Sequence, residues 1–152
     1  MNLEVKPATL EDIHFIVDAQ IIMALETENL TLDRKTVTKG VQAVMEDPQK
    51  GQYWIAMEAE QALGCLLTLN EWSDWRNGNV LWIHSAYVCK EARGKGAFKA
   101  LYLHLKNIVQ QSQELKGLRL YVDKSNQNAI NVYSKLGMTN EHYELFEWLK
   151  DY

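Results

Sequence analysis

The chain has 152 residues and a formal net charge of -4. This length suits one domain with a substantial core, expected to span 1–152, and the acidic balance excludes a bulk nucleic-acid-binding protein. The first residues carry no leader pattern, and no apolar run approaches the roughly 20 residues of a membrane span. We therefore expect a cytoplasmic protein without membrane contact. Cys65 and Cys89 belong to no Cys-x-x-Cys pair or His cluster, which predicts buried free thiols and no metal site.

The first half of the chain mixes helical and extended patterns. Thr9, with Asp12 three residues later, is typical of a capping box at the start of a helix. Asp33 is suited to cap a second helix. Alternating or apolar runs predict four strands, of which the second and third form a hairpin. The expected strands lie at 2–6, 53–57, 63–69 and 80–88, with a polar loop at 71–79.

Strands and helices alternate in the second half. A helix is expected over 97–111, a strand over 118–122 and a final strand over 143–149. Between these two strands a short helix is expected to be capped by Asn126 or Ser125 and to end at Leu136. Strand–helix–strand units favour parallel pairing, whereas the earlier hairpin favours antiparallel pairing. The predicted fold class is α/β, with a mixed central β-sheet flanked by helices on both faces.

The loop Arg93-Gly94-Lys95-Gly96-Ala97-Phe98 lies between the apolar strand and the 97–111 helix. Glycines let the backbone approach a ligand closely, and a helix N-terminus attracts anions. The loop alone would also suit a basic surface turn. It is neither of two common phosphate loops, because GxxxxGK followed by Ser or Thr is absent and Lys99 stands where a dinucleotide fingerprint needs a third glycine.

A third pattern fits better. Arg93-x-x-Gly96-x-Phe98 after Val88 resembles the Arg/Gln-x-x-Gly-x-Gly/Ala loop of the GNAT acetyltransferase superfamily, although Phe98 replaces a small residue. Asn126-x-x-Ala129-x-x-x-Tyr133-x-x-x-Gly137-Met138 resembles a second signature of the same superfamily, about thirty residues further on. Together the two motifs indicate a GNAT-like acyl-CoA N-acyltransferase fold.

The resemblance implies acetyl-CoA as co-substrate. Residues 93–98 would hold its pyrophosphate, Tyr87 and Val88 would lie beside the pantetheine arm, and Asn126 would contact that arm. Tyr133 would bind there as well and would protonate the leaving thiolate as general acid. Phe98 would alter helix packing without removing the backbone N–H donors.

The base and the acceptor site are less constrained. Strand alternation predicts that Trp82, His84, Ala86 and Val88 share one face, which makes His84 the best-placed base. A hydrogen-bonded pocket-wall histidine is the alternative. Glu26 and Glu28, at the end of the first long helix, are further candidates for the base and, with Trp82, for binding the acceptor.

The sequence thus predicts an N-acetyltransferase in which a primary amine attacks acetyl-CoA directly in a ternary complex, with no metal. Small molecules, peptide N-termini and protein lysines all remain open as acceptors, and so does a homodimer. The alternatives are a non-catalytic acyl-CoA-binding sensor and an interaction module without CoA.

Overall fold

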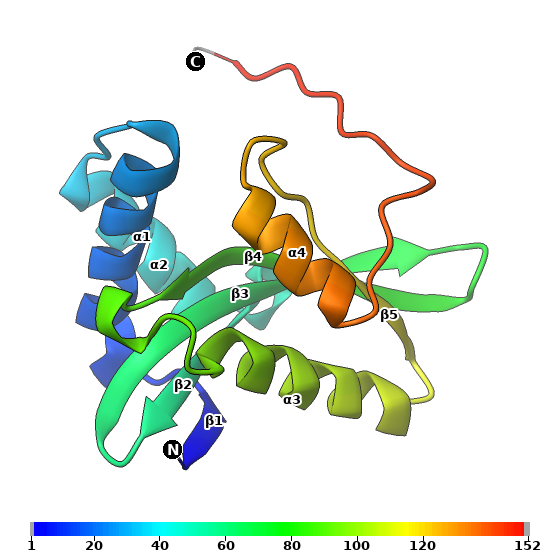
Figure 1. The fold of residues 1–152 in the computed structure, drawn as a ribbon, viewed down its shortest axis with the longest axis horizontal. Helices are drawn as coiled ribbons and strands as arrows, with labels where there is room; N and C mark the ends of the chain where they lie inside the picture. Colours follow the sequence, from blue (N-terminus) through cyan, green and yellow to red (C-terminus); the bar gives the residue numbers. More distant parts are fainter. Residues whose placement is uncertain (1, 151–152) are drawn as a thin grey trace. The chain divides into compact units, whose positions relative to one another are not determined.

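The computed structural model describes residues 2–150, which form two compact units, one up to Leu120 and one from Tyr121 onward. The first unit is built on a five-stranded sheet in the order β1-β2-β3-β4-β5 (Figure 1). The first four strands pair antiparallel and β5 pairs parallel to β4. The strands are β1 (Leu3–Pro7), β2 (Gln52–Glu58), β3 (Gln61–Ser73), β4 (Gly78–Val88) and β5 (Leu115–Arg119).

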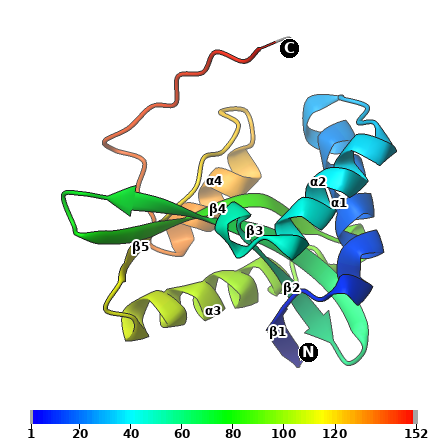
Figure 2. The same cartoon turned by 180° about the vertical axis from the view of Figure 1, so that it is seen from behind.

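Helices cover both faces of this sheet, as the sequence predicts (Figures 1 and 2). They are α1 (Ile13–Glu28), α2 (Arg34–Glu46) and α3 (Ala97–Gln111). On one face α1 and α2 enclose a core with Tyr53, Ile55 and Cys65 of the sheet. On the other face Trp54 packs against His104 of α3, with ring centroids 5.2 Å apart. Neighbouring strand residues point to opposite faces, so β2 contributes to both cores.

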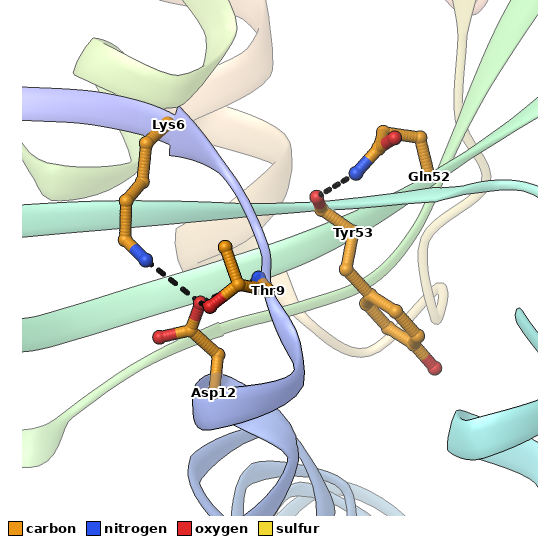
Figure 3. Close-up of polar contacts among 5 residues, drawn as sticks. All are labelled: Lys6, Thr9, Asp12, Gln52 and Tyr53. Carbon is orange, nitrogen blue, oxygen red and sulfur yellow. Dashed lines mark hydrogen bonds and ion pairs between the residues drawn. The ribbon is translucent and has the colours of Figure 1, made fainter. Parts of the chain in front are cut away.

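The connection from β1 to α1 is held by polar contacts (Figure 3). The Asp12 carboxylate accepts hydrogen bonds from Thr9 N–H and Lys6 Nζ, both at 2.7 Å. Burial alone would raise the pKa of Asp12, but these hydrogen bonds outweigh it and lower the pKa. The Tyr53 carbonyl accepts from Gln52 Nε2 at 2.7 Å and from Ala8 N–H at 2.9 Å. The predicted cap at Thr9 and Asp12 therefore lies where the chain enters α1.

Several predicted elements agree closely with the structure. The Asp33 side chain caps α2 by accepting from Thr36 N–H at 2.9 Å. Helix α3 has the predicted bounds, 97–111. In the second unit, α4 (Gln127–Lys135) follows the N-cap Asn126 and ends before Gly137, which has a φ of 90°. These elements depend on local signals, namely apolar periodicity and capping residues.

Other expectations are wrong. The polar loop over 71–79 shrinks to a turn, because β3 continues to Ser73 and β4 begins at Gly78. The strand expected at 118–122 lies instead at Leu115–Arg119, in register with β4. No strand forms over 143–149, where the side chains are exposed. Apolar alternation describes two faces of a strand but supplies no hydrogen-bonding neighbour, and that neighbour decides whether a strand forms. Along residues 2–150, no helix combines the length and apolar character needed to cross a membrane.

Candidate active site

A β-bulge interrupts β4 near its end. Cys65 of β3 pairs with Tyr87, and Leu67 pairs with His84, so β4 uses three residues where β3 uses two. Ser85 lies inside this bulge with a φ of 52°, a left-handed conformation that is costly for a non-glycine residue. Such strained positions cluster at functional sites. The bulge therefore marks the end of β4 as a place where chain geometry departs from regular pairing.

The bulge changes which side chains share a face. Leu67 and Tyr87 both pack against the core formed with α1 and α2, and His84 lies opposite Leu67. His84 and Tyr87 therefore lie on the same face although they are three residues apart. The prediction that Ala86 and Val88 share the face of Trp82 and His84 is wrong, because one extra residue reverses the alternation beyond the bulge. Sequence carried no signal for this, since Ser85 is neither Gly nor Asn.

Gly64 on β3 lies opposite Val88, where β3 and β4 approach closely. A Cβ at position 64 would lie 2.7 Å from the Tyr87 carbonyl oxygen, a backbone atom that cannot move alone. Gly64 is not among the residues predicted for the site, although a glycine inside an apolar strand is a signal for close backbone approach.

Replacing Gly64 with Ala should destabilise the fold by about 1–3 kcal/mol, because β3 and β4 must separate beside the bulge. The free energy of unfolding from urea denaturation measures this. Gly117→Ala on β5 is the matched control, since a Cβ there meets nothing within 4 Å. Equal stability of the two variants would contradict the close approach.

The glycine-rich loop ends at the N-terminus of α3. Gly94 and Gly96 adopt φ values of 75° and 92°, and both lie exposed with open space around them. Gly96 is the N-cap, so no side chain caps α3, and the first turn contains no acidic residue. The first N–H groups of a helix have no acceptor within that helix. With Lys95 exposed in the same loop, this arrangement suits a phosphate-bearing ligand.

Arg93 makes the loop's long-range contacts. Its Nη2 donates to Glu26 Oε2 at 2.7 Å, and its Nε donates to the Val88 carbonyl at 3.0 Å. Its Cζ lies 5.8 Å from the centroid of the Tyr87 ring. Burial is the main cause that raises the pKa of Tyr87, with the Glu26 carboxylate contributing. Four residues that the sequence singled out for two different ligands thus meet at one point: Glu26, Tyr87, Val88 and Arg93.

Trp82 and His84 lie further back along the same strand. Their ring centroids are 6.1 Å apart, and both side chains are half-buried. Burial lowers the pKa of His84, which favours the neutral imidazole at neutral pH. Trp82 Nε1 donates to Glu71 Oε2 at 2.8 Å, and Arg119 Nη1 donates to Glu71 Oε1, also at 2.8 Å. Arg119 is not among the residues predicted for the site, and it lies beside Trp82 only because β4 and β5 pair in parallel.

The remaining candidates lie elsewhere. Glu28 is exposed on the last turn of α1. Phe98 is half-buried in the first turn of α3. In the second unit, Asn126 Oδ1 accepts from Ala129 N–H at 3.1 Å and so caps α4, which carries Tyr133 on its next turns. Burial raises the pKa of Tyr133, so its phenol stays protonated well above neutral pH. Within residues 2–150, no three His, Cys, Asp or Glu side chains are grouped to hold a metal ion.

Comparisons with known proteins agree with this architecture. A crystal structure described as a possible acetyltransferase from Clostridium difficile 630 matches over 100% of both chains, with a TM-score of 0.91 and 38% identity. The ribosomal-protein-alanine N-acetyltransferase of Brucella melitensis biovar Abortus 2308 shares the fold at 13% identity and a TM-score of 0.79, covering 98% of this chain and 100% of that one.

A predicted acetyltransferase from Clostridium acetobutylicum, solved with acetyl-CoA, has a TM-score of 0.69 at 20% identity, covering 98% of this chain and 95% of that one. No curated protein matches the chain in sequence. A model of the Acetyltransferase (GNAT) family matches residues 20–138. Because that match spans most of the sequence and the Clostridium difficile protein is similar along its whole length, this chain belongs to the GNAT acetyltransferase family.

Proposed function

We propose that this chain is an N-acetyltransferase that moves an acetyl group from acetyl-CoA to a primary amine. Family membership supports acetyl transfer. The choice of acetyl-CoA as donor rests on the exposed N-terminus of α3. This helix end follows two glycines at positive φ, and it has neither a capping side chain nor an acidic residue in its first turn. Open space around Gly94 and Gly96 fits a bound pyrophosphate.

The acetyl-CoA thioester supplies an electrophilic carbonyl and a thiolate leaving group. In our proposal the loop over 93–98 binds the donor, the end of β4 at Tyr87 and Val88 lies along its arm, and Asn126 contacts it. Tyr133 Oη donates a proton to the departing sulfur. The raised pKa of Tyr133 supports this role, since the phenol then remains protonated at neutral pH.

His84 is the base in this proposal. Its lowered pKa favours the neutral imidazole, the form that can accept the proton of an incoming ammonium. Trp82, whose ring lies close to His84, favours a cationic amine on this face of β4. Glu28 is a further candidate for contact with the acceptor. The amine attacks directly while both substrates are bound, so orientation supplies much of the rate.

Isothermal titration with acetyl-CoA tests the donor site. We expect the wild type to bind, and we expect Gly96→Glu to weaken binding at least about tenfold, because it adds a side chain and a negative charge where N–H groups face the ligand. Gly137→Glu is the matched control, since Gly137 is also exposed, adopts a φ of 90° and has open space around it, so both variants add the same charge at a positive φ.

Turnover is then followed by thiol release with a panel of amines. The panel includes a polyamine, an aminoglycoside, an amino acid, a peptide N-terminus and a lysine peptide. Release with at least one amine supports the transferase. Tight binding without release from any amine would support the acyl-CoA-binding sensor instead. Absence of acetyl-CoA binding by the wild type would refute both.

A further inference from the structure

Arg93 links the glycine loop to α1 and to the end of β4. Its guanidinium group contacts Glu26 near the end of α1, the Val88 carbonyl at the end of β4 and the Tyr87 ring. Glu26 lies 67 residues away in the chain. Arg93 also directly precedes Gly94, the first residue of the loop with positive φ. One side chain therefore ties the start of the glycine loop to α1.

The loop depends on its ends for its position. Gly94 and Gly96 have no side chains, and Lys95 is exposed. Ala97 is 1% exposed and anchors the far end in the core beneath α3. At the end of the loop nearest β4, Ala92 is buried. The side-chain contacts of Arg93 fix the direction of the chain after Ala92. Loss of the Arg93 contacts would free the loop at that end.

The charges point to positioning rather than to direct donor contact. The Arg93 Nε and Nη2 atoms are already hydrogen-bonded, and the Glu26 carboxylate balances the guanidinium charge. Arginine holds two acceptors at once with a planar fork, which lysine cannot do. The attraction for an anion then comes chiefly from Lys95 and the N-terminus of α3.

We propose that Glu26 is a positioning residue that acts through Arg93 to hold the glycine loop in its ligand-binding shape. The effect on acetyl-CoA rests on the function proposed above. Two interpretations of Arg93 predict opposite results. If Arg93 binds the donor through its charge, removing Glu26 frees that charge and strengthens binding. If Arg93 holds the loop, removing Glu26 weakens binding.

The first measurement requires no ligand. The Lys95 and Ala100 N–H groups donate to the Ala92 and Gly96 carbonyls, so their exchange with solvent reports on the loop. Hydrogen exchange at these two amides should be faster in Glu26→Ala than in Glu46→Ala, which removes an exposed charge from the end of α2. The two side chains of the Arg93–Glu26 pair are partly exposed, with 44% for Arg93 and 39% for Glu26, so its loss should cost little global stability and the two variants should be nearly equally stable. Equal exchange at Lys95 and Ala100 in the two variants would overturn the positioning role, whatever the protein's reaction.

The second measurement uses acetyl-CoA. Glu26→Ala should raise the Kd and KM for acetyl-CoA by about threefold or more, with kcat within about twofold of the wild type. Arg93→Lys should also weaken acetyl-CoA binding, because lysine cannot hold both acceptors. The double variant, Glu26→Ala with Arg93→Lys, should bind no more weakly than the weaker-binding single variant, because both changes break the same contact. Tighter binding by Glu26→Ala, or full binding by Arg93→Lys, would overturn the proposal. Faster exchange together with no acetyl-CoA binding by the wild type would refute only the proposed function.

Discussion

Replacing Tyr133 with Phe should lower kcat by about 10²-fold or more while leaving the Kd for acetyl-CoA nearly unchanged. The substitution removes the phenolic proton that we propose is donated to the departing sulfur, and it keeps the aromatic ring of this α4 residue. Burial raises the pKa of Tyr133, so the phenol stays protonated and has a proton to donate across the neutral range. Steady-state thiol release and calorimetry measure the two quantities separately.

Tyr102→Phe provides the matched control for Tyr133→Phe. Tyr102 is buried in α3, and burial raises the pKa of its phenol as well, so the same atom is removed from a tyrosine that has no role in the proposed reaction. We expect kcat of this control to stay close to that of the wild type. A kcat within twofold of the wild type for Tyr133→Phe would remove the general-acid assignment and leave acetyl transfer itself intact.

Leu101→Ala should reduce the free energy of unfolding by about 2–5 kcal/mol, a large part of the roughly 5–15 kcal/mol of an ordinary domain. Leu101 is 0% exposed on the inner face of α3, where truncation leaves a cavity against the sheet. Because the glycine loop ends at the first residue of α3, we also expect weaker acetyl-CoA binding near the unfolding temperature. Urea denaturation gives the stability change.

Leu103 lies two residues along the same helix and is 45% exposed, so Leu103→Ala removes the same atoms from the outer face. Its expected cost is well under that of Leu101→Ala, because little apolar surface leaves water at that position. If the two variants lost equal free energy of unfolding, burial of Leu101 between α3 and the sheet would contribute no more to the stability of the protein than the exposed Leu103.

The candidate site was predictable in its parts but not in its arrangement. Glycine conformations and the start of α3 follow from the loop's own residues, and the motifs that resemble the GNAT superfamily correctly predicted the family. The contact between Arg93 and Glu26 was not predictable, because the two residues are 67 positions apart in the chain. The sequence also suggested different ligands for them, acetyl-CoA for Arg93 and the acceptor for Glu26. Arg119 likewise became relevant only through parallel pairing of β4 and β5.

By itself the sequence determined the features that depend on neighbours in the chain. Periodicity and caps located α2, α3 and α4, and apolar runs located most strands, because hydrogen bonds and side-chain contacts within a few residues dominate there. The tertiary structure decided the rest. Pairing with β3 placed the bulge at Ser85 and brought Tyr87 onto the face of His84. The same dependence explains why 143–149 forms no strand: extended backbone becomes a strand only where another strand satisfies its N–H and C=O groups, and that partner lies elsewhere in the chain.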